Sequence, residues 1–316
     1  MLRGVGFKIA STMFFSGMIA LVKLSSGAYP IAEIVFFRAF FAILVLFAWL
    51  AWLGEFPRAL RTKWLSGHLL RSLAGTASLL LSFSSFALLP LADATAIGYA
   101  GPLFIVVMAG LLLHERVGPA RWAAVALGTG GVLLMLWEHL GAGAETGPRG
   151  ALGALCAIGN AFAVSIAMIQ TRRLMRSENM GAVVFYFQST GSFFAALIMI
   201  AAALWPGAGP VAAFVQAQAW ISPAPADWAM LIGAGFLGGI GQIFMTTSYK
   251  LADASIIACF EYTSMIWALI FGALFFGEAP TAIVLTGAAI VTFAGIVVVL
   301  SERGWVTARL AVSRAR

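Results

Sequence analysis

Long, uninterrupted apolar segments dominate this 316-residue sequence and constrain its fold more than any other feature. A helix that crosses a bilayer needs about 20 mostly apolar residues. Ten segments meet this requirement: residues 5–26, 30–53, 66–89, 92–113, 119–137, 149–171, 180–204, 227–249, 254–277 and 281–301. The runs are continuous and lack the alternation typical of β-barrel strands. We therefore expect an all-α integral membrane protein with ten transmembrane helices.

The composition excludes several classes of function. The chain is 62% hydrophobic and 10% charged, whereas a soluble domain carries about 25% charged residues. Its net charge of +7 does not indicate a nucleic-acid partner, because the basic residues are spread between apolar spans and form no continuous face. Cys156 and Cys259 form no C-x-x-C pair, so neither a disulfide framework nor a metal site is indicated, and we expect no cofactor.

The basic residues also predict an orientation. Sixteen of the 19 Lys and Arg residues fall on one side if the N-terminus is cytoplasmic, with Lys8 and Arg71 counted among the flanking residues on that side. Basic residues concentrate on the cytoplasmic side of membrane proteins. We therefore expect a multi-pass protein of the cytoplasmic (inner) membrane with both termini in the cytoplasm. The longest outer connection, residues 205–226, contains no charged residue.

A short motif recurs at matching positions in the two halves. Leu91-Ala92-Asp93-Ala94 returns 160 residues later as Leu251-Ala252-Asp253-Ala254, and Glu115 and Glu278 end the spans that follow. Each half holds five spans, and an odd number inverts the second half relative to the first. Inverted repeats are typical of secondary transporters, whose substrate site lies near the midplane. We expect repeats at 1–137 and 149–301, followed by a basic cytoplasmic tail at 302–316.

Several motifs carry a family resemblance: residues 33–38, 87–94, 102–104, Glu115, 260–264 and 276–278. They resemble the drug/metabolite transporter superfamily, specifically its EamA-type ten-helix members, over nearly the whole chain. The resemblance implies transport of small metabolites, since members export amino acids and drugs or take up metabolites. The S-adenosylmethionine uptake group has a similar second span. Many members carry proline in span 9 where this chain has residues 261–263, so the site in the second half is expected to differ from theirs.

Charged residues inside spans are costly and are the first candidates for function. Glu261 lies eight residues into span 9, about 12 Å deep, where a carboxylate suits proton coupling or binding of a cationic group. Arg38 can bind a substrate carboxylate or phosphate through its planar guanidinium, or instead reach outward to water or pair with an acid. Lys23 and Glu33 flank the first outer turn and are expected to pair with each other.

Uncharged polar and aromatic side chains form a second group of candidates for substrate binding. These are Tyr99, Asn160, Gln188, Gln242, Tyr262 and Trp267. An amide within the membrane must find a partner, so helix–helix contact is the alternative for each amide, and packing is the alternative for each aromatic ring. Gly75 and Gly235 are separated by the repeat offset of 160 residues and predict close helix crossings.

The pattern as a whole predicts a secondary transporter that works by alternating access, as a monomer or homodimer in the bilayer. Its substrate would be an amino acid or related compound, moved with proton coupling or by exchange. Uptake of a nucleoside-like or vitamin-like metabolite, such as S-adenosylmethionine, is one alternative, and a lipid-linked flippase is another. An enzyme is disfavoured, because the three histidines lie at span edges and no intramembrane Ser/His pair or Asp dyad is present. The lack of a Gly-rich phosphate loop disfavours direct use of ATP by this chain.

Overall fold

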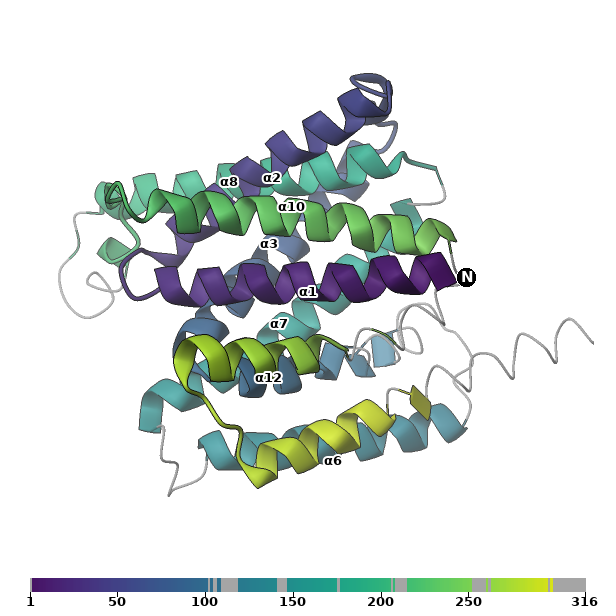
Figure 1. Cartoon of the computed structure of the whole chain (residues 1–316), viewed down its shortest axis with the longest axis vertical. Helices are drawn as coiled ribbons and strands as arrows, with labels where there is room; N and C mark the ends of the chain where they lie inside the picture. Colours follow the sequence, from purple (N-terminus) through teal and green to yellow (C-terminus); the bar gives the residue numbers. More distant parts are fainter. Residues whose placement is uncertain are drawn as a thin grey trace, which may run out of the picture.

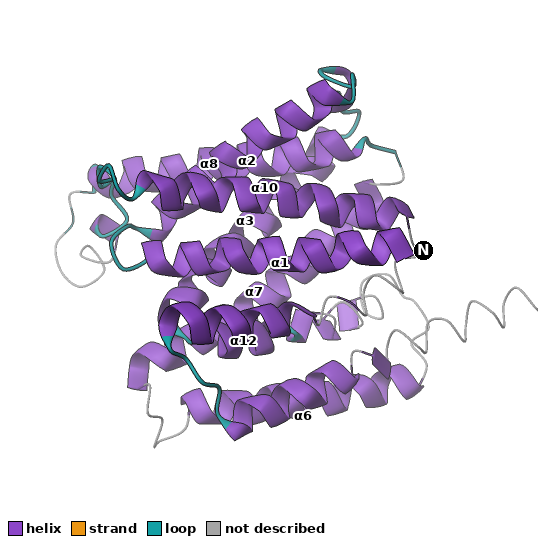
Figure 2. Ribbon diagram, viewed as in Figure 1, coloured by secondary structure: helices purple, strands orange, loops and turns teal. Residues whose placement is uncertain are grey.

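The computed structural model describes residues 2–101, 103–104, 107–108, 119–140, 147–174, 177–205, 207, 215–251, 260, 263–294 and 296–297. Within these ranges every regular element is a helix (Figure 2). The labelled helices are α1 (Leu2–Ser25), α2 (Ile31–Trp52), η1 (Arg58–Leu60), α3 (Leu65–Leu88), α4 (Leu91–Gly98), α6 (Pro119–Leu140), α7 (Gly147–Leu174), α8 (Met180–Ala203), α10 (Trp228–Leu251) and α12 (Thr263–Phe276). A further apolar helix, Ala282–Ala294, follows α12.

These helices fall where the apolar segments predict them. Each of the ten predicted spans contains a described helix, and six of these helices are long and apolar enough to cross a membrane. Large apolar side chains point outward, for example Phe193 and Leu274, which are 63% and 71% exposed. Hydrocarbon tolerates such a surface, and each helix satisfies its own backbone hydrogen bonds. The prediction of an all-α, multi-pass membrane fold is confirmed.

The helices lie side by side and alternate in direction (Figure 1). One end of the bundle, called here the α1–α2 end, contains the turn at residues 26–30 and the C-terminus of α12. The opposite end, called the α2–α3 end, contains residues 53–64 and the N-terminus of α8. A site can therefore be located by its distance from either end.

The packing of the two halves is symmetric. Exchanging α1 with α7, α2 with α8, α3 with α10 and α4 with α12 turns each major contact into another observed contact. Thus α1 packs on α10 as α7 packs on α3, and α2 packs on α10 as α8 packs on α3. The pairs α2–α8 and α4–α12 exchange into themselves. This pattern is that of two five-helix repeats related by a pseudo-twofold axis, as the sequence predicts.

Two glycines show how closely the halves approach. A Cβ added at Gly75 in α3 would lie 2.6 Å from the Phe187 ring in α8, and one added at Gly235 in α10 would lie 2.3 Å from the Phe41 Cβ in α2. These are equivalent crossings in the symmetric packing, and each admits only glycine without a shift of its neighbour. The predicted close crossings are present at both positions.

Candidate functional site

Arg38 and Gln188 meet where the two repeats face each other. Arg38 is the eighth residue of α2 and Gln188 the ninth of α8, so the two hold nearly equivalent places in helices that the pseudo-twofold axis exchanges. The Arg38 Nη1 donates to the Gln188 Oε1 at 2.8 Å. At 1.5 Å per residue, each lies about 10–12 Å from the end where its own helix begins. Their long side chains therefore meet well inside the bundle.

The environment of Arg38 distinguishes between the alternatives predicted for it, which are anion binding, contact with water and pairing with an acid. Its side chain does not reach water, since the residue is only 2% exposed. No acid pairs with it among the residues that the structure describes. The Arg38 Nε and the Gln188 Nε2 lack hydrogen-bond partners there as well. A charge at the centre of a membrane helix costs about 2.5–3.5 kcal/mol on insertion scales, so this arginine is a strong functional candidate.

Arg71 is a second cation inside the bundle; it is half-buried, although the sequence pattern predicts a position on the cytoplasmic flank. It is instead the seventh residue of α3, and its guanidinium carbon lies 3.9 Å from the centroid of the Phe187 ring. Its Nε donates to the Thr171 Oγ1 at 3.2 Å, while its Nη1 has no partner in the described part of the chain. The Arg38 guanidinium lies 5.8 Å from the same ring. Lys8, also counted as a flank, is buried within α1.

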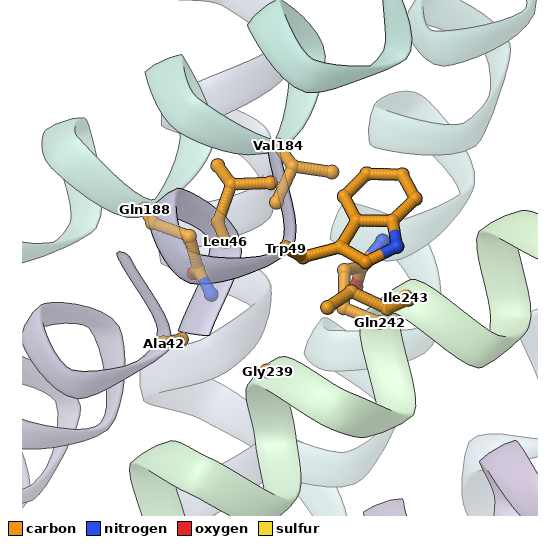
Figure 3. A pocket seen from close by; sticks show the side chains of 8 residues that line it. All are labelled: Ala42, Leu46, Trp49, Val184, Gln188, Gly239, Gln242 and Ile243. Atoms are coloured by element: carbon orange, nitrogen blue, oxygen red, sulfur yellow. The ribbon is translucent and has the colours of Figure 1, made fainter. Parts of the chain in front are cut away.

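Gln188 also lines a small pocket. The pocket lies between α2, α8 and α10, whose side chains face one another in Figure 3. Its lining residues are Ala42, Leu46, Trp49, Val184, Gln188, Gly239, Gln242 and Ile243. Most of these are apolar, and two amides supply the polar groups, which is the usual composition of a small-molecule site. Gln188 and Gln242, both candidates from the sequence, thus line the same pocket.

The remaining candidates lie apart from this pocket. Asn160 accepts a hydrogen bond from the Ser78 hydroxyl at 2.6 Å, which joins α7 to α3. Tyr99 and Ser264 are hydrogen-bonded at 2.9 Å, and the Trp267 Nε1 is buried without a partner in the described ranges. These contacts belong to the α3–α7 and α4–α12 pairs. Glu261 and Tyr262 lie outside the described residues.

Polar contacts close the α1–α2 end between the repeats. Lys23 in α1 forms an ion pair with Glu278, which follows α12, and also donates to the Leu89 carbonyl at 2.6 Å. The second oxygen of Glu278 accepts the Leu91 N–H at 2.7 Å. We call these contacts the Lys23–Glu278 latch. The expected pairing of Lys23 with Glu33 is wrong, because Lys23 turns towards the second repeat.

Glu33 takes part in a second set of contacts at the same end. Its Oε2 accepts the N–H of Ile221, while the Tyr29 hydroxyl donates to Asp227 at 2.6 Å and accepts the Ala224 N–H. The pKa of Tyr29 is raised above its ordinary value, because the hydrogen bond that its hydroxyl donates to Asp227 favours the protonated phenol. Residues 215–227 are therefore fastened over the start of α2. Both sets of contacts lie at the α1–α2 end, whereas the pocket lies in the half nearer the α2–α3 end.

A helical bundle of two repeats, with polar groups buried between them, has the architecture of transporters with inverted repeats. The chain belongs to the EamA-like transporter family, whose pattern matches residues 2–137 and 151–301. A solved crystal structure shares the fold with a TM-score of 0.62 at 22% identity, over 96% of this chain and 98% of that chain.

Three similar proteins are named as transporters of metabolites. The pseudopaline exporter CntI of Pseudomonas aeruginosa is 26% identical over 95% of this chain and 97% of its own length. A riboflavin transporter of Rhizobium johnstonii is 28% identical, over 87% of this chain and 83% of its own. An S-adenosylmethionine uptake transporter of Rickettsia prowazekii is 26% identical, over 86% of this chain and 83% of its own. Together with the family match, these relatives make the chain a multi-pass small-metabolite transporter.

Proposed function

We propose that this chain moves an amino acid or a related small metabolite across the cytoplasmic membrane by alternating access of a site between its two repeats. The observation that carries the proposal is the contact of Arg38 with Gln188 between the two repeats, because transporters with inverted repeats bind substrate near the midplane at that interface. The donor groups that these residues leave unpaired suit a polar solute.

In the proposed orientation both termini are cytoplasmic, so the α1–α2 end faces outward. The charge distribution supports this orientation, since Arg58, Arg61 and Lys63 lie at the α2–α3 end. The latch then lies on the outside, and the pocket lies nearer the cytoplasm. The α2–α3 end also carries contacts between the repeats, since Glu178 accepts the Lys63 N–H at 2.9 Å and lies 3.4 Å from the His68 imidazole. Transport requires the contacts at the two ends to break and form in turn, through a rocking of one repeat against the other.

Reconstitution tests the proposal. Proteoliposomes that contain the purified protein would be loaded with one unlabelled solute from a panel of amino acids, nucleosides and vitamins. Uptake of the same solute in labelled form would then be followed. Saturable counterflow of at least one solute is expected. The panel includes riboflavin and S-adenosylmethionine, because relatives carry those names and favour a vitamin-like or nucleoside-like substrate as the second candidate. Flux that fails to saturate would indicate a channel, and movement of a labelled lipid alone a flippase.

Proton coupling through Glu261 is a separate part of the proposal. A carboxylate this far into span 9 can gain and lose a proton as the site changes its exposure. Glu261→Gln is expected to remove the pH dependence of transport and to slow net uptake while exchange persists. Glu55→Gln, at an exposed acid between α2 and α3, is the control. If the rate and its pH dependence both survive in Glu261→Gln, the coupling residue lies elsewhere.

A further inference from the structure

We propose that Arg38 and Arg71 together bind an anionic group of the transported molecule, either a carboxylate or a phosphate, where α2, α3 and α8 meet. This inference rests on the proposed function and names the substrate class of that site. The two arginines come from different helices and are 33 residues apart in sequence, so only the folded chain brings them to one ring. We call Arg38, Arg71, Phe187 and Gln188 the arginine cradle.

The first argument is the charge of the cradle. The two guanidinium groups lie 5.8 and 3.9 Å from the centroid of the Phe187 ring, so their separation cannot exceed the sum of these distances. Neither forms an ion pair within the described ranges. The face of an aromatic ring attracts a cation but carries no charge to neutralise it. Two like charges in a poorly solvated site repel each other, and an anion between them would remove that repulsion.

The second argument is the kind of atom that remains unpaired. The Arg38 Nε, the Arg71 Nη1 and the Gln188 Nε2 are buried and lack hydrogen-bond partners among the described residues. All three are donors only. A buried donor without an acceptor is costly, so the site as a whole requires a ligand that accepts several hydrogen bonds. Carboxylate and phosphate oxygens are the acceptors that a planar guanidinium binds best, with two parallel hydrogen bonds.

Two buried hydroxyl groups of α3 follow Arg71 closely in sequence, at Ser72 and Thr76. Ser72 and Thr76 are buried, and neither hydroxyl has a partner in the described part of the chain. A Cβ added at Gly191 in α8 would lie 3.7 Å from both the Thr76 Oγ1 and the Ala39 Cβ, so Thr76 lies where the three helices converge. The hydroxyls can donate to further oxygens of the same anion. Gln188 also lines the apolar pocket, so the site adjoins apolar side chains of α2, α8 and α10.

A purely structural role for Arg71 is the competing explanation, since its Nε already binds Thr171. The two roles differ in what the variants change. A structural arginine affects stability for every ligand alike, whereas an anion-binding arginine affects anions and leaves matched neutral compounds unchanged. A lysine in its place keeps the positive charge but loses the paired donors, so it separates charge from geometry.

The experiment measures thermal stabilisation of the purified, detergent-solubilised full-length protein by matched pairs of probes. Succinate is compared with succinamide, glutarate with its dimethyl ester, and inorganic phosphate with its trimethyl ester, each titrated to 50 mM. The proteins are the wild type, Arg38→Lys, Arg71→Lys, Arg71→Gln and the control Arg173→Gln, at an exposed cation of α7. Size-exclusion profiles establish whether each variant is folded. If Arg71→Gln does not fold, the two lysine variants provide the test.

We expect at least one anion to stabilise the wild type and the control, with at least 30-fold weaker binding in Arg71→Gln and about 10-fold weaker binding in each lysine variant. The neutral partners should bind no better than buffer. The inference would be overturned if the arginine variants lost affinity equally for charged and neutral probes. It would also be overturned if Arg38→Lys and Arg71→Lys bound anions as tightly as the wild type. No stabilisation by any anion up to 50 mM would overturn it too. Arginine-dependent anion binding without counterflow of any solute would retain the inference and refute the proposed function.

Discussion

The Lys23–Glu278 latch gives a prediction about which end of the protein opens. It joins α1 and the α3–α4 turn of the first repeat to Glu278, two residues after α12 of the second, so opening the α1–α2 end must separate its partners. Glu278 uses one oxygen for Lys23 and the other for the Leu91 N–H. In Glu278→Gln the amide NH₂ must face one of these two donors. The substitution keeps the volume of the side chain, but the new amide NH₂ then faces either the Lys23 ammonium or the Leu91 N–H, both of which are donors.

The size of the effect follows from these contacts. A hydrogen bond to a charged group contributes about 1.5–3 kcal/mol, and Glu278→Gln removes one such bond together with the charge that pairs with Lys23. The side chains of Lys23 and Glu278 are only 14% and 17% exposed, so water replaces little of the loss. Because the latch exists only in the closed state, the ratio of open to closed protein should rise about 10- to 150-fold.

Cysteine accessibility measures this shift. Ala20, one turn before Lys23 and 2% exposed, is replaced by Cys in a chain in which Cys156 and Cys259 are Ala. The rate of modification by a membrane-impermeant maleimide is then compared in right-side-out and inverted vesicles. Glu278→Gln should raise the rate on one vesicle type alone, while Glu55→Gln should leave it unchanged. A rate within twofold of the background chain in both orientations would refute the reasoning.

Two further predictions concern packing and pH. Gly75→Ala places a methyl group 2.6 Å from the Phe187 ring and 3.1 Å from the Arg71 Nη1. It should therefore destabilise the protein by about 1–3 kcal/mol, measured by thermal unfolding, and weaken anion binding. The control Gly6→Ala, with open space around the added methyl group, should do neither. Burial alone would raise the pKa of Glu178, but hydrogen bonds from the Lys63 N–H and from Thr62, with the nearby His68, lower it. A lowered pKa stabilises the fold above the unfolded value of about 4.3 and loses this effect as pH falls through the folded value. The difference in melting temperature between wild type and Glu178→Gln should therefore shrink from pH 7 to pH 4, and a constant difference would contradict this assignment.

The sequence predicts the spans because each transmembrane helix is encoded locally. Every span must be apolar enough for lipid and must satisfy its own backbone hydrogen bonds. About 20 consecutive residues are therefore enough to recognise it. The Leu-Ala-Asp-Ala motif and the equally spaced Gly75 and Gly235 also record the repeat directly. The candidate residues Arg38, Gln188 and Gln242 follow from the same rule, since polar groups inside spans are rare.

Arg71 was misassigned for a related reason. It lies near the start of α3, and counting basic residues by side treats such an arginine as one more cytoplasmic charge. Its position five residues inside the predicted span 66–89 was the available signal. Its contact with Phe187 could not be read from the chain, because that ring lies more than 100 residues away in sequence.

The sequence by itself thus determined the membrane class, the helical spans and the two-repeat plan, all of which depend on hydrophobicity and spacing along the chain. Only the tertiary structure decided the partners of the charged groups. Lys23 joins Glu278 across 255 residues and not its neighbour Glu33, and Arg38 joins Gln188 across 150. The choice of partner depends on which helices the packing brings together. In lipid that packing follows from small residues and shape complementarity between helices that are remote in sequence.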